Sequence, residues 1–302
     1  MTTTLASILI PTYNHARTLP LAIRSALRQT VDEIEIVIIG DGVTADTRAA
    51  IEEIIDTDRR IRFLDYKKGP HHGEIHRNTA IHEAVSPNIF YLSDDDLFLP
   101  DHVADLLCLL KTANFVQSRN GCFNSDGTLW LYPTNLADPE SISWHLRLPP
   151  RNRVSLTGTA HSREFYMQLD RGWETTPVGY WPDHFMWMKF FNRPEFKGAT
   201  SSRMTALQFP HHLRHESNWS DGQILAEFLQ WVKIVESDGG QEKINELANQ
   251  AAHVAVQWLD RELNLCQEKL WETEQRLQQA ERRVLYLSGL QAEASSETDS
   301  LN

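Results

Sequence analysis

The chain has 302 residues, of which 41% are hydrophobic and 23% charged, and its formal charge at pH 7 is −12. This balance is typical of a globular protein with one large domain or two smaller ones, and the negative charge argues against nucleic acid or an anionic membrane surface as the main partner. No apolar run approaches a transmembrane segment, the N-terminus lacks a basic signal-peptide start, and the three cysteines are scattered, so we expect a reduced, cytoplasmic protein.

The first third of the chain alternates strand and helix patterns. Such an order is typical of an α/β fold, in which a doubly wound, mostly parallel sheet carries helices on both faces. We expect strands at 7–10, 35–39, 61–64 and 89–92, and helices at 18–29, 44–55, 74–84 and 100–112.

From Phe115 the pattern changes to short segments that are broken by Asn, Gly and Pro. Asn124-Ser-Asp-Gly127 between apolar residues predicts a hairpin turn. Short helices are expected at 164–169 and 184–192. We therefore divide this part of the chain into residues 1–115 and residues 116–238, two halves of the same domain.

The third region begins near Gly239-Gly240 and is strongly helical. A coiled coil between subunits or a long helix packed on its own domain would both fit this pattern, and we favour a homo-oligomer formed through this helix. We expect residues 239–290 to form this helical extension and residues 291–302 to be disordered. One set of residues recurs every seven positions: Val256, Leu263, Leu270, Leu277 and Val284. A second set follows three residues after each, Leu259, Cys266, Thr273, Ala280 and Leu287, in which Cys, Thr and Ala make the heptad weak.

The most informative segment is Asn88–Pro100, in which a buried apolar run ends in Asp94, Asp95 and Asp96. Three adjacent carboxylates repel one another, so a folded protein keeps them together where a cation offsets the repulsion. Mg²⁺ or Mn²⁺ is the natural candidate because these ions take oxygen ligands and often share them with phosphates. The alternative is a solvated acidic turn before a helix.

Polar segments also follow two other predicted strands, Pro11-Thr-Tyr-Asn14 the first and Gly40-Asp41-Gly42 the second. Ligands in open α/β sheets bind just beyond the carboxyl ends of the strands, so these segments and the acidic trio predict a nucleotide crevice. Asp41 would accept a hydrogen bond from a base, although an Asp-Gly turn explains it equally well. Arg77, at a helix start, is a candidate contact to a phosphate or base.

Together these segments resemble the family 2 glycosyltransferases of the GT-A fold, over roughly residues 5–220. The resemblance lies in Ser7-Ile-Leu-Ile-Pro-Thr-Tyr-Asn14, in 35–47, in Arg77-Asn78, in Tyr91-Leu-Ser-Asp-Asp-Asp-Leu-Phe-Leu-Pro100 and in 179–184, five motifs in the family's order. The acidic segment is especially similar to the spore-coat polysaccharide branch. Two acids of the usual pattern are replaced, by Gly40 and by Ser93.

The resemblance implies a nucleotide-sugar-binding half in residues 1–115, an acceptor-binding half in residues 116–238, and a cofactor. The donor is a nucleotide-diphosphate sugar, UDP- or dTDP-linked, and the cofactor is Mn²⁺ or Mg²⁺ on its diphosphate. It assigns nucleotide-sugar binding to Pro11, Thr12, Tyr13, Asp41, Arg77 and Asp94, and metal binding to Asp95, Asp96 and His215.

The resemblance also implies a mechanism. Asp183 would take the proton from an acceptor hydroxyl, which gives a single displacement with inversion. On the residues alone, Asp183 could instead cap the helix that follows it. The acceptor would be a glycan, glycolipid or protein, which could place the protein at a membrane periphery. The alternative function is a non-catalytic scaffold or regulatory partner that acts through its coiled coil.

Overall fold

Four parallel strands form one half of the central sheet in the computed structural model, which describes residues 3–299. They stand in the order β4-β1-β2-β3, and the helices α1, α2 and α3 connect them. This alternation confirms the predicted βα repeat. The bounds are β1 Ala6–Thr12, α1 Leu19–Leu27, β2 Ile34–Asp41, α2 Ala45–Ile55, β3 Ile61–Tyr66, α3 Glu74–Glu83 and β4 Asn88–Tyr91.

Three later strands complete a seven-stranded sheet in the order β10-β6-β9-β4-β1-β2-β3. β9 (Thr159–Ser162) is antiparallel to both β4 and β6 (Phe115–Gln117), whereas β10 (Gly198–Thr200) is parallel to β6. The sheet is therefore mostly parallel, as the sequence predicts. Because β9 inserts beside β4, residues 116–238 extend the same sheet as residues 1–115.

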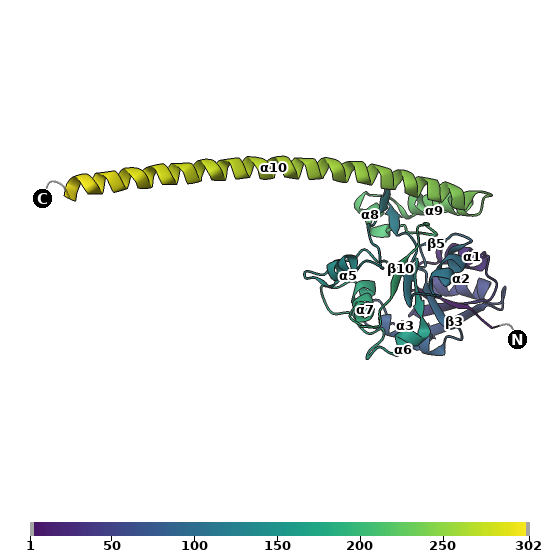
Figure 1. Cartoon of the computed structure of the whole chain (residues 1–302). Coiled ribbons are helices and arrows are strands. Elements are labelled where there is room, and N and C mark those ends of the chain that lie inside the picture. The colour runs from purple at the N-terminus through teal and green to yellow at the C-terminus, as the bar shows by residue number, and fades with distance from the viewer. Residues whose placement is uncertain (1–2, 300–302) are drawn as a thin grey trace. The chain divides into compact units, whose positions relative to one another are not determined.

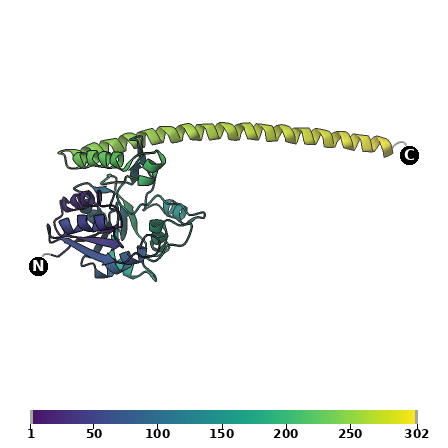
Figure 2. The same ribbon diagram turned by 180° about the vertical axis from the view of Figure 1, so that it is seen from behind.

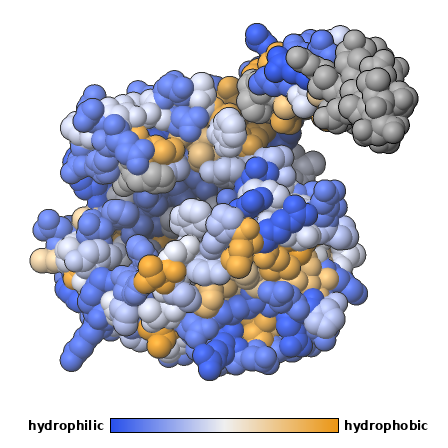
Figure 3. All heavy atoms as spheres, turned by 90° about the vertical axis from the view of Figure 1, so that its left-hand side faces the viewer, coloured by the Kyte–Doolittle hydropathy of each residue, from blue (hydrophilic) through white to orange (hydrophobic). Residues whose placement is uncertain are grey.

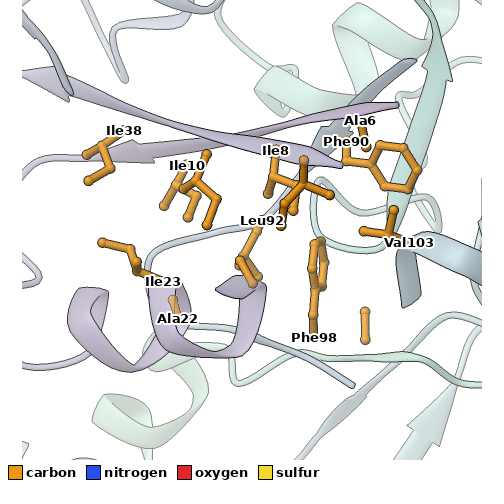
Figure 4. Packing of buried hydrophobic residues seen from close by; sticks show 14 of the residues in the cluster. Ala6, Ile8, Ile10, Ala22, Ile23, Ile38, Phe90, Leu92, Phe98 and Val103 are labelled. Atoms are coloured by element: carbon orange, nitrogen blue, oxygen red, sulfur yellow. The ribbon is translucent and has the colours of Figure 1, made fainter. Parts of the chain in front are cut away.

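Alternate residues of each inner strand face opposite sides of this sheet. Ile8 and Ile10 of β1 pack on α1 and α4 (His102–Leu109), whereas Leu9 between them faces the other side. Figure 4 shows Ile23 of α1 below Ile10 and Ile38. Since both faces are covered, these strands are continuously apolar, which is typical of a buried parallel sheet.

The opposite face is covered by α3, α5 (Pro139–Leu146), α6 (Arg163–Met167) and α7 (Pro182–Phe191). In Figure 1 these helices lie on the other side of the sheet from α1 and α2, and Figure 2 gives the reverse view. Trp187 of α7 is fully buried there, and its indole N–H donates to the Val154 carbonyl at 2.9 Å. The predicted helices at 164–169 and 184–192 are confirmed within a few residues.

A third apolar cluster lies beyond the acidic trio. It joins β5 (Leu97–Phe98), its antiparallel partner β11 (Ala206–Leu207), and the hairpin of β7 (Gly121–Phe123) and β8 (Leu129–Leu131) to the helix α9 (Asp221–Val235). The turn predicted at 124–127 closes this hairpin, with the Gly127 N–H donating to the Asn124 carbonyl at 3.0 Å. The short helix α8 (His211–Glu216) precedes α9.

The helix α10 runs from Gly240 to Asp299 and crosses a division of the chain into two units, Met1–Ala251 and Ala252–Asn302. Its first turns belong to the larger unit because Ile244 and Ala248 are buried in the third cluster. The helix continues beyond residue 290, where we expected order to end, and residues 300–302 lie outside the described residues. No helix within 3–299 is long and apolar enough to cross a membrane.

Four histidines in the larger unit are buried, His102, His145, His161 and His184, and two of them have pKa values that predict sensitivity to acid. His102 bonds to the Thr205 hydroxyl at 2.8 Å and His161 to the Tyr91 hydroxyl at 2.8 Å, and burial lowers the pKa of His102 to about 3 and of His161 to about 4. Unfolded histidine titrates near ~6.5, so below that pH the unfolded chain takes up protons that the folded chain excludes.

We expect the free energy of unfolding to fall between about pH 6.5 and pH 4, by about 2 kcal/mol per histidine at pH 5. Urea unfolding followed by tryptophan fluorescence at pH 7 and pH 5 measures the fall. His161→Gln should reduce it by about 2 kcal/mol at pH 5, the contribution of that histidine, whereas replacement of the exposed His253 should not change it. An unchanged fall in the His161 variant would contradict this explanation.

Candidate functional site

The ends of β1, β2 and β4 meet at one edge of the sheet. In the register of the strands, Thr12 stands opposite Gly40, and Leu9 stands opposite Tyr91. β1 extends through Pro11 and Thr12, two residues further than predicted. Leu9 is the last residue of β1 that pairs with β4, and Pro11, beyond it, still pairs with β2. The three predicted polar segments therefore lie at the same edge.

A histidine that the sequence analysis missed joins the acidic trio. His15 Nδ1 lies 2.7 Å from Asp94 Oδ1. His15, Asp94 and Asp95 each offer one possible ligand atom, and these three atoms lie within 4.8 Å of one another. Burial lowers the pKa of His15, but the Asp94 bond and the charges of Asp94, Asp95 and Asp96 outweigh burial and raise this pKa to about 9. Burial, followed by the charges of Asp96 and Asp94, raises the pKa of Asp95 well above its usual value. The group therefore offers two carboxylates and an imidazole, a donor set that suits a divalent cation.

Asp96 points into the protein and ties two later segments to the acidic turn. Its carboxylate accepts hydrogen bonds from the Thr157 hydroxyl at 2.5 Å and from the Phe209 N–H at 2.9 Å. Burial raises the pKa of Asp96 to about 6, although these two bonds favour the charged form. The structure thus groups Asp95 with Asp94 and His15, while Asp96 holds residues before β9 and after β11.

The predicted ligand His215 lies exposed on α8, outside the group of His15, Asp94 and Asp95. Its neighbour Arg214 is fully buried and pairs with Glu227 of α9 through two contacts, the longer at 2.8 Å. The ion pair between Arg214 and Glu227 therefore holds α8 against α9. A role of His215 at a metal stays a prediction.

Asp41, the last residue of β2, is buried beneath the loop 67–73. Its carboxylate accepts a hydrogen bond from the Gly69 N–H at 2.6 Å, forms an ion pair with Lys68, and lies 3.4 Å from His76 Nε2. A side chain at Gly73 would collide with it, since a Cβ there would lie 2.3 Å from Asp41 Cγ. The carboxylate therefore orders the loop.

Tyr13 and Thr12 border this loop. The Tyr13 ring is 44% exposed and lies 5.3 Å from Lys68 Nζ, so one face of an aromatic ring is available at the sheet edge. The hydroxyl of Thr12 is buried and has no hydrogen-bond partner among the described residues. Both features suit a planar ligand with polar edges.

Arg77 is buried on α3 with its guanidinium 4.8 Å from the centre of the Trp173 ring. Its Nε and Nη1 make no hydrogen bond within residues 3–299, and neither does Oε1 of the buried Glu74. Burial lowers the pKa of Arg77, while the charges of Glu74, Tyr91 and Asp183 oppose this effect. Buried N–H groups without partners are rare in native proteins, and they point to an anionic or carbonyl ligand.

Trp173 is held in place beneath Arg77 by two tyrosines. Its indole N–H donates to the Tyr91 hydroxyl at 3.0 Å, and its backbone N–H donates to the Tyr166 hydroxyl at 2.8 Å. Gly172 permits this approach, because a Cβ there would lie 2.0 Å from the Tyr166 hydroxyl. The Gly172-Trp173 pair thus supports Arg77 from below.

Asp183 lies in the first turn of α7, where Trp181, not Asp183, occupies the N-cap position. Its Oδ1 accepts a hydrogen bond from the His184 N–H at 2.8 Å. Burial raises the pKa of Asp183, while the bonds to His184 and Asn152 and the charge of Arg77 oppose this rise. A carboxylate that is partly desolvated and opposite a cation is a candidate proton acceptor.

Figure 3 shows a recess with mainly hydrophilic walls on the face that it depicts.

Comparisons with known proteins agree with this geometry. The family model described as glycosyl transferase family 2 matches residues 7–171. A chondroitin synthase of Pasteurella multocida is 32% identical over 177 residues, which cover 57% of this chain and 17% of that protein. An uncharacterized glycosyltransferase of Rickettsia felis is 37% identical over 116 residues, 38% of this chain and 19% of that protein. The chain thus spans less than a fifth of these two relatives.

Two solved structures share the fold. TarS 1-349 of S. aureus in complex with UDP-GlcNAc has a TM-score of 0.54 at 15% identity, covering 82% of this chain and 71% of that chain. The mannosyltransferase PcManGT of Pyrobaculum calidifontis, in complex with GDP-Man and Mn²⁺, has a TM-score of 0.50 at 17% identity, covering 82% and 68%. The comparisons show the family, but they do not specifically show the spore-coat branch.

Proposed function

This chain belongs to glycosyl transferase family 2, and we propose that it moves a sugar from a nucleotide-diphosphate sugar to an acceptor hydroxyl with inversion. The observation that carries the proposal is the buried guanidinium of Arg77, whose Nε and Nη1 have no hydrogen-bond partner in residues 3–299 and which lies close enough to Asp183 and Asp41 to feel their charges. A scaffold that binds no anionic ligand has no use for such a group, because an unsatisfied buried donor costs roughly 1–3 kcal/mol.

The nucleotide is assigned to the ends of β1 and β2. Tyr13 would stack on the base, Pro11 and Thr12 would border it, and Asp41 would accept a base N–H in place of its contact with Lys68. A uracil or thymine N–H suits a carboxylate acceptor. TarS, a structural neighbour in complex with UDP-GlcNAc, supports a nucleotide-linked donor, and we keep UDP- and dTDP-linked sugars as the proposed classes.

The divalent ion, Mn²⁺ or Mg²⁺, is assigned to Asp95, with Asp94 and His15 beside it. The donor set fits, because the three side chains converge within 4.8 Å and the carboxylates need a cation. When bound, the ion would neutralise charge on the departing diphosphate. His15 would have to lose its proton to bind the ion, and Asp94 would either share the ion or face the ribose. PcManGT, in complex with GDP-Man and Mn²⁺, supports this cofactor class.

The proton transfer is assigned to Asp183. Its carboxylate would accept the proton of the acceptor hydroxyl while that oxygen attacks the anomeric carbon and the bond to the diphosphate breaks. Burial makes this carboxylate a stronger base than one in water. The free N–H groups of Arg77 would donate to the diphosphate oxygens.

The acceptor is proposed to be a glycan or a glycolipid in polysaccharide synthesis, with a protein acceptor as the alternative. Similar proteins include chondroitin synthases and a glucosyltransferase of Campylobacter jejuni, named for an undecaprenol-linked substrate, which is 28% identical over 104 residues. An acceptor of that last kind would bring a cytoplasmic protein to the membrane surface.

The test is release of nucleoside diphosphate from UDP-, dTDP- and GDP-linked sugars in long incubations with Mn²⁺, with water as the acceptor. We expect release from one nucleotide class, and we expect EDTA to stop it. The Asp183→Asn variant is the negative control. Release that is equal in the variant and in the wild type would remove Asp183 from the proposed role.

A further inference from the structure

The segment of α10 from Val256 to Ala280 presents an apolar seam with nothing packed on it among the described residues. Leu259, Leu263, Leu270 and Leu277 are each between 55% and 60% exposed. They follow the a and d positions of a heptad for three and a half repeats, about 37 Å of helix. Such a seam needs a partner with the same repeat, and a second copy of the same helix has it.

We propose that two copies of this chain form a parallel, two-stranded coiled coil through residues 256–280. The orientation follows from the charges that flank the seam. Gln267 and Glu274 occupy e positions, while Lys269 and Arg276 occupy g positions. In a parallel pair each g residue faces the next e residue of the partner, so Lys269 of each copy meets Glu274 of the other.

An antiparallel pair is disfavoured by the same residues. In that arrangement g positions face g positions, which over residues 256–280 brings Lys269 of one copy against Lys269 of the other. Like charges at these flanking positions repel, so the pattern selects the parallel pair. The Thr273 hydroxyl already donates to the Lys269 carbonyl at 2.8 Å.

Cys266 gives a direct readout of orientation. In a parallel pair in register, d residues of the two copies face each other, so the two Cys266 thiols would lie side by side. In an antiparallel pair over residues 256–280 each Cys266 would instead face Leu270 of the other copy, about one helical turn from the partner's thiol. Cys266 is exposed and forms no disulfide within the described chain.

The first experiment is mild oxidation of the full chain, followed by non-reducing gel electrophoresis and light scattering. We expect a dimer with twice the chain mass, and a cross-link that Cys266→Ser abolishes and Cys108→Ser leaves intact. A monomer, a trimer, or a dimer whose cross-link does not depend on Cys266 would overturn the proposal. Leu263→Glu with Leu270→Glu should give a monomer, and metal-dependent nucleotide binding, a property of the other unit, should persist in it.

A charge reversal tests the orientation independently of the thiol. In the parallel pair Lys269→Glu places two acids opposite each other at both symmetric contacts, so we expect the dimer to dissociate about ten-fold more readily. Adding Glu274→Lys in the same chain should restore the affinity. If Lys269→Glu leaves the affinity of the dimer unchanged, as expected for an antiparallel pair in which Lys269 faces Lys269, the proposal is wrong.

Discussion

Replacing Asp183 with asparagine should lower the rate of sugar transfer by about 10²- to 10⁴-fold, the usual range for loss of a general base. The amide keeps the size of the carboxylate and can still accept from the His184 N–H, which lies 2.8 Å from Oδ1 in the wild type. The fold and the nucleotide site should therefore persist. The measurement is the transfer or hydrolysis rate at saturating donor, together with nucleotide affinity by calorimetry.

The matched control for this prediction is Asp221→Asn. Asp221 also lies in the first turn of a helix, α9, but it is exposed. Both variants lose a negative charge near a helix N-terminus, which costs about 0.3–1 kcal/mol of stability at most exposed sites. Only the Asp183 variant should lose activity. Equal activity in both variants would mean that another group accepts the proton.

Replacing Asp95 with asparagine should remove the effect of Mn²⁺ on nucleotide binding. We expect the affinity for the nucleotide in Mn²⁺ to fall at least about ten-fold, to the value that the wild type shows in EDTA, because ligand changes commonly weaken metal sites by 10–100-fold. Affinity measured without metal should hardly change. A variant that still responds to Mn²⁺ like the wild type would show that Asp95 does not bind the ion.

We expect replacement of Asp96 to affect stability rather than the response to Mn²⁺. Its carboxylate holds the Thr157 hydroxyl and the Phe209 N–H, so Asp96→Asn should lower the free energy of unfolding by about 1–3 kcal/mol. We expect this variant to keep a response to Mn²⁺ wherever it remains folded. Loss of the response in a folded Asp96 variant, with stability unchanged, would restore Asp96 as a metal ligand.

The sequence predicted the sheet because its signals are local. The apolar strands end at polar turns, the helices between them have their own periodicity, and Asn124–Gly127 has the residues of a hairpin turn. The antiparallel strand β9 was not predicted. Its residues, Thr159–Ser162, carry no periodic signal, and their place between β4 and β6 depends on contacts that are distant in the chain.

The site was only partly predictable for the same reason. The acidic trio and Asp41 follow strands, so topology alone brings them together. His15 and Asp94 are 79 residues apart, and nothing in the local sequence indicates their contact. The different surroundings of Asp95 and Asp96 could not be predicted either, because Asp96 is held by Thr157 and Phe209 from later segments.

The most direct test of the central claim is calorimetric titration of the wild-type chain with UDP, dTDP and GDP, each with and without Mn²⁺. The proposed function predicts that one uracil or thymine nucleotide binds tightly, and only with the metal. Binding of none of the three under either condition would contradict a nucleotide-sugar transferase. It would instead favour a scaffold that acts through its coiled coil.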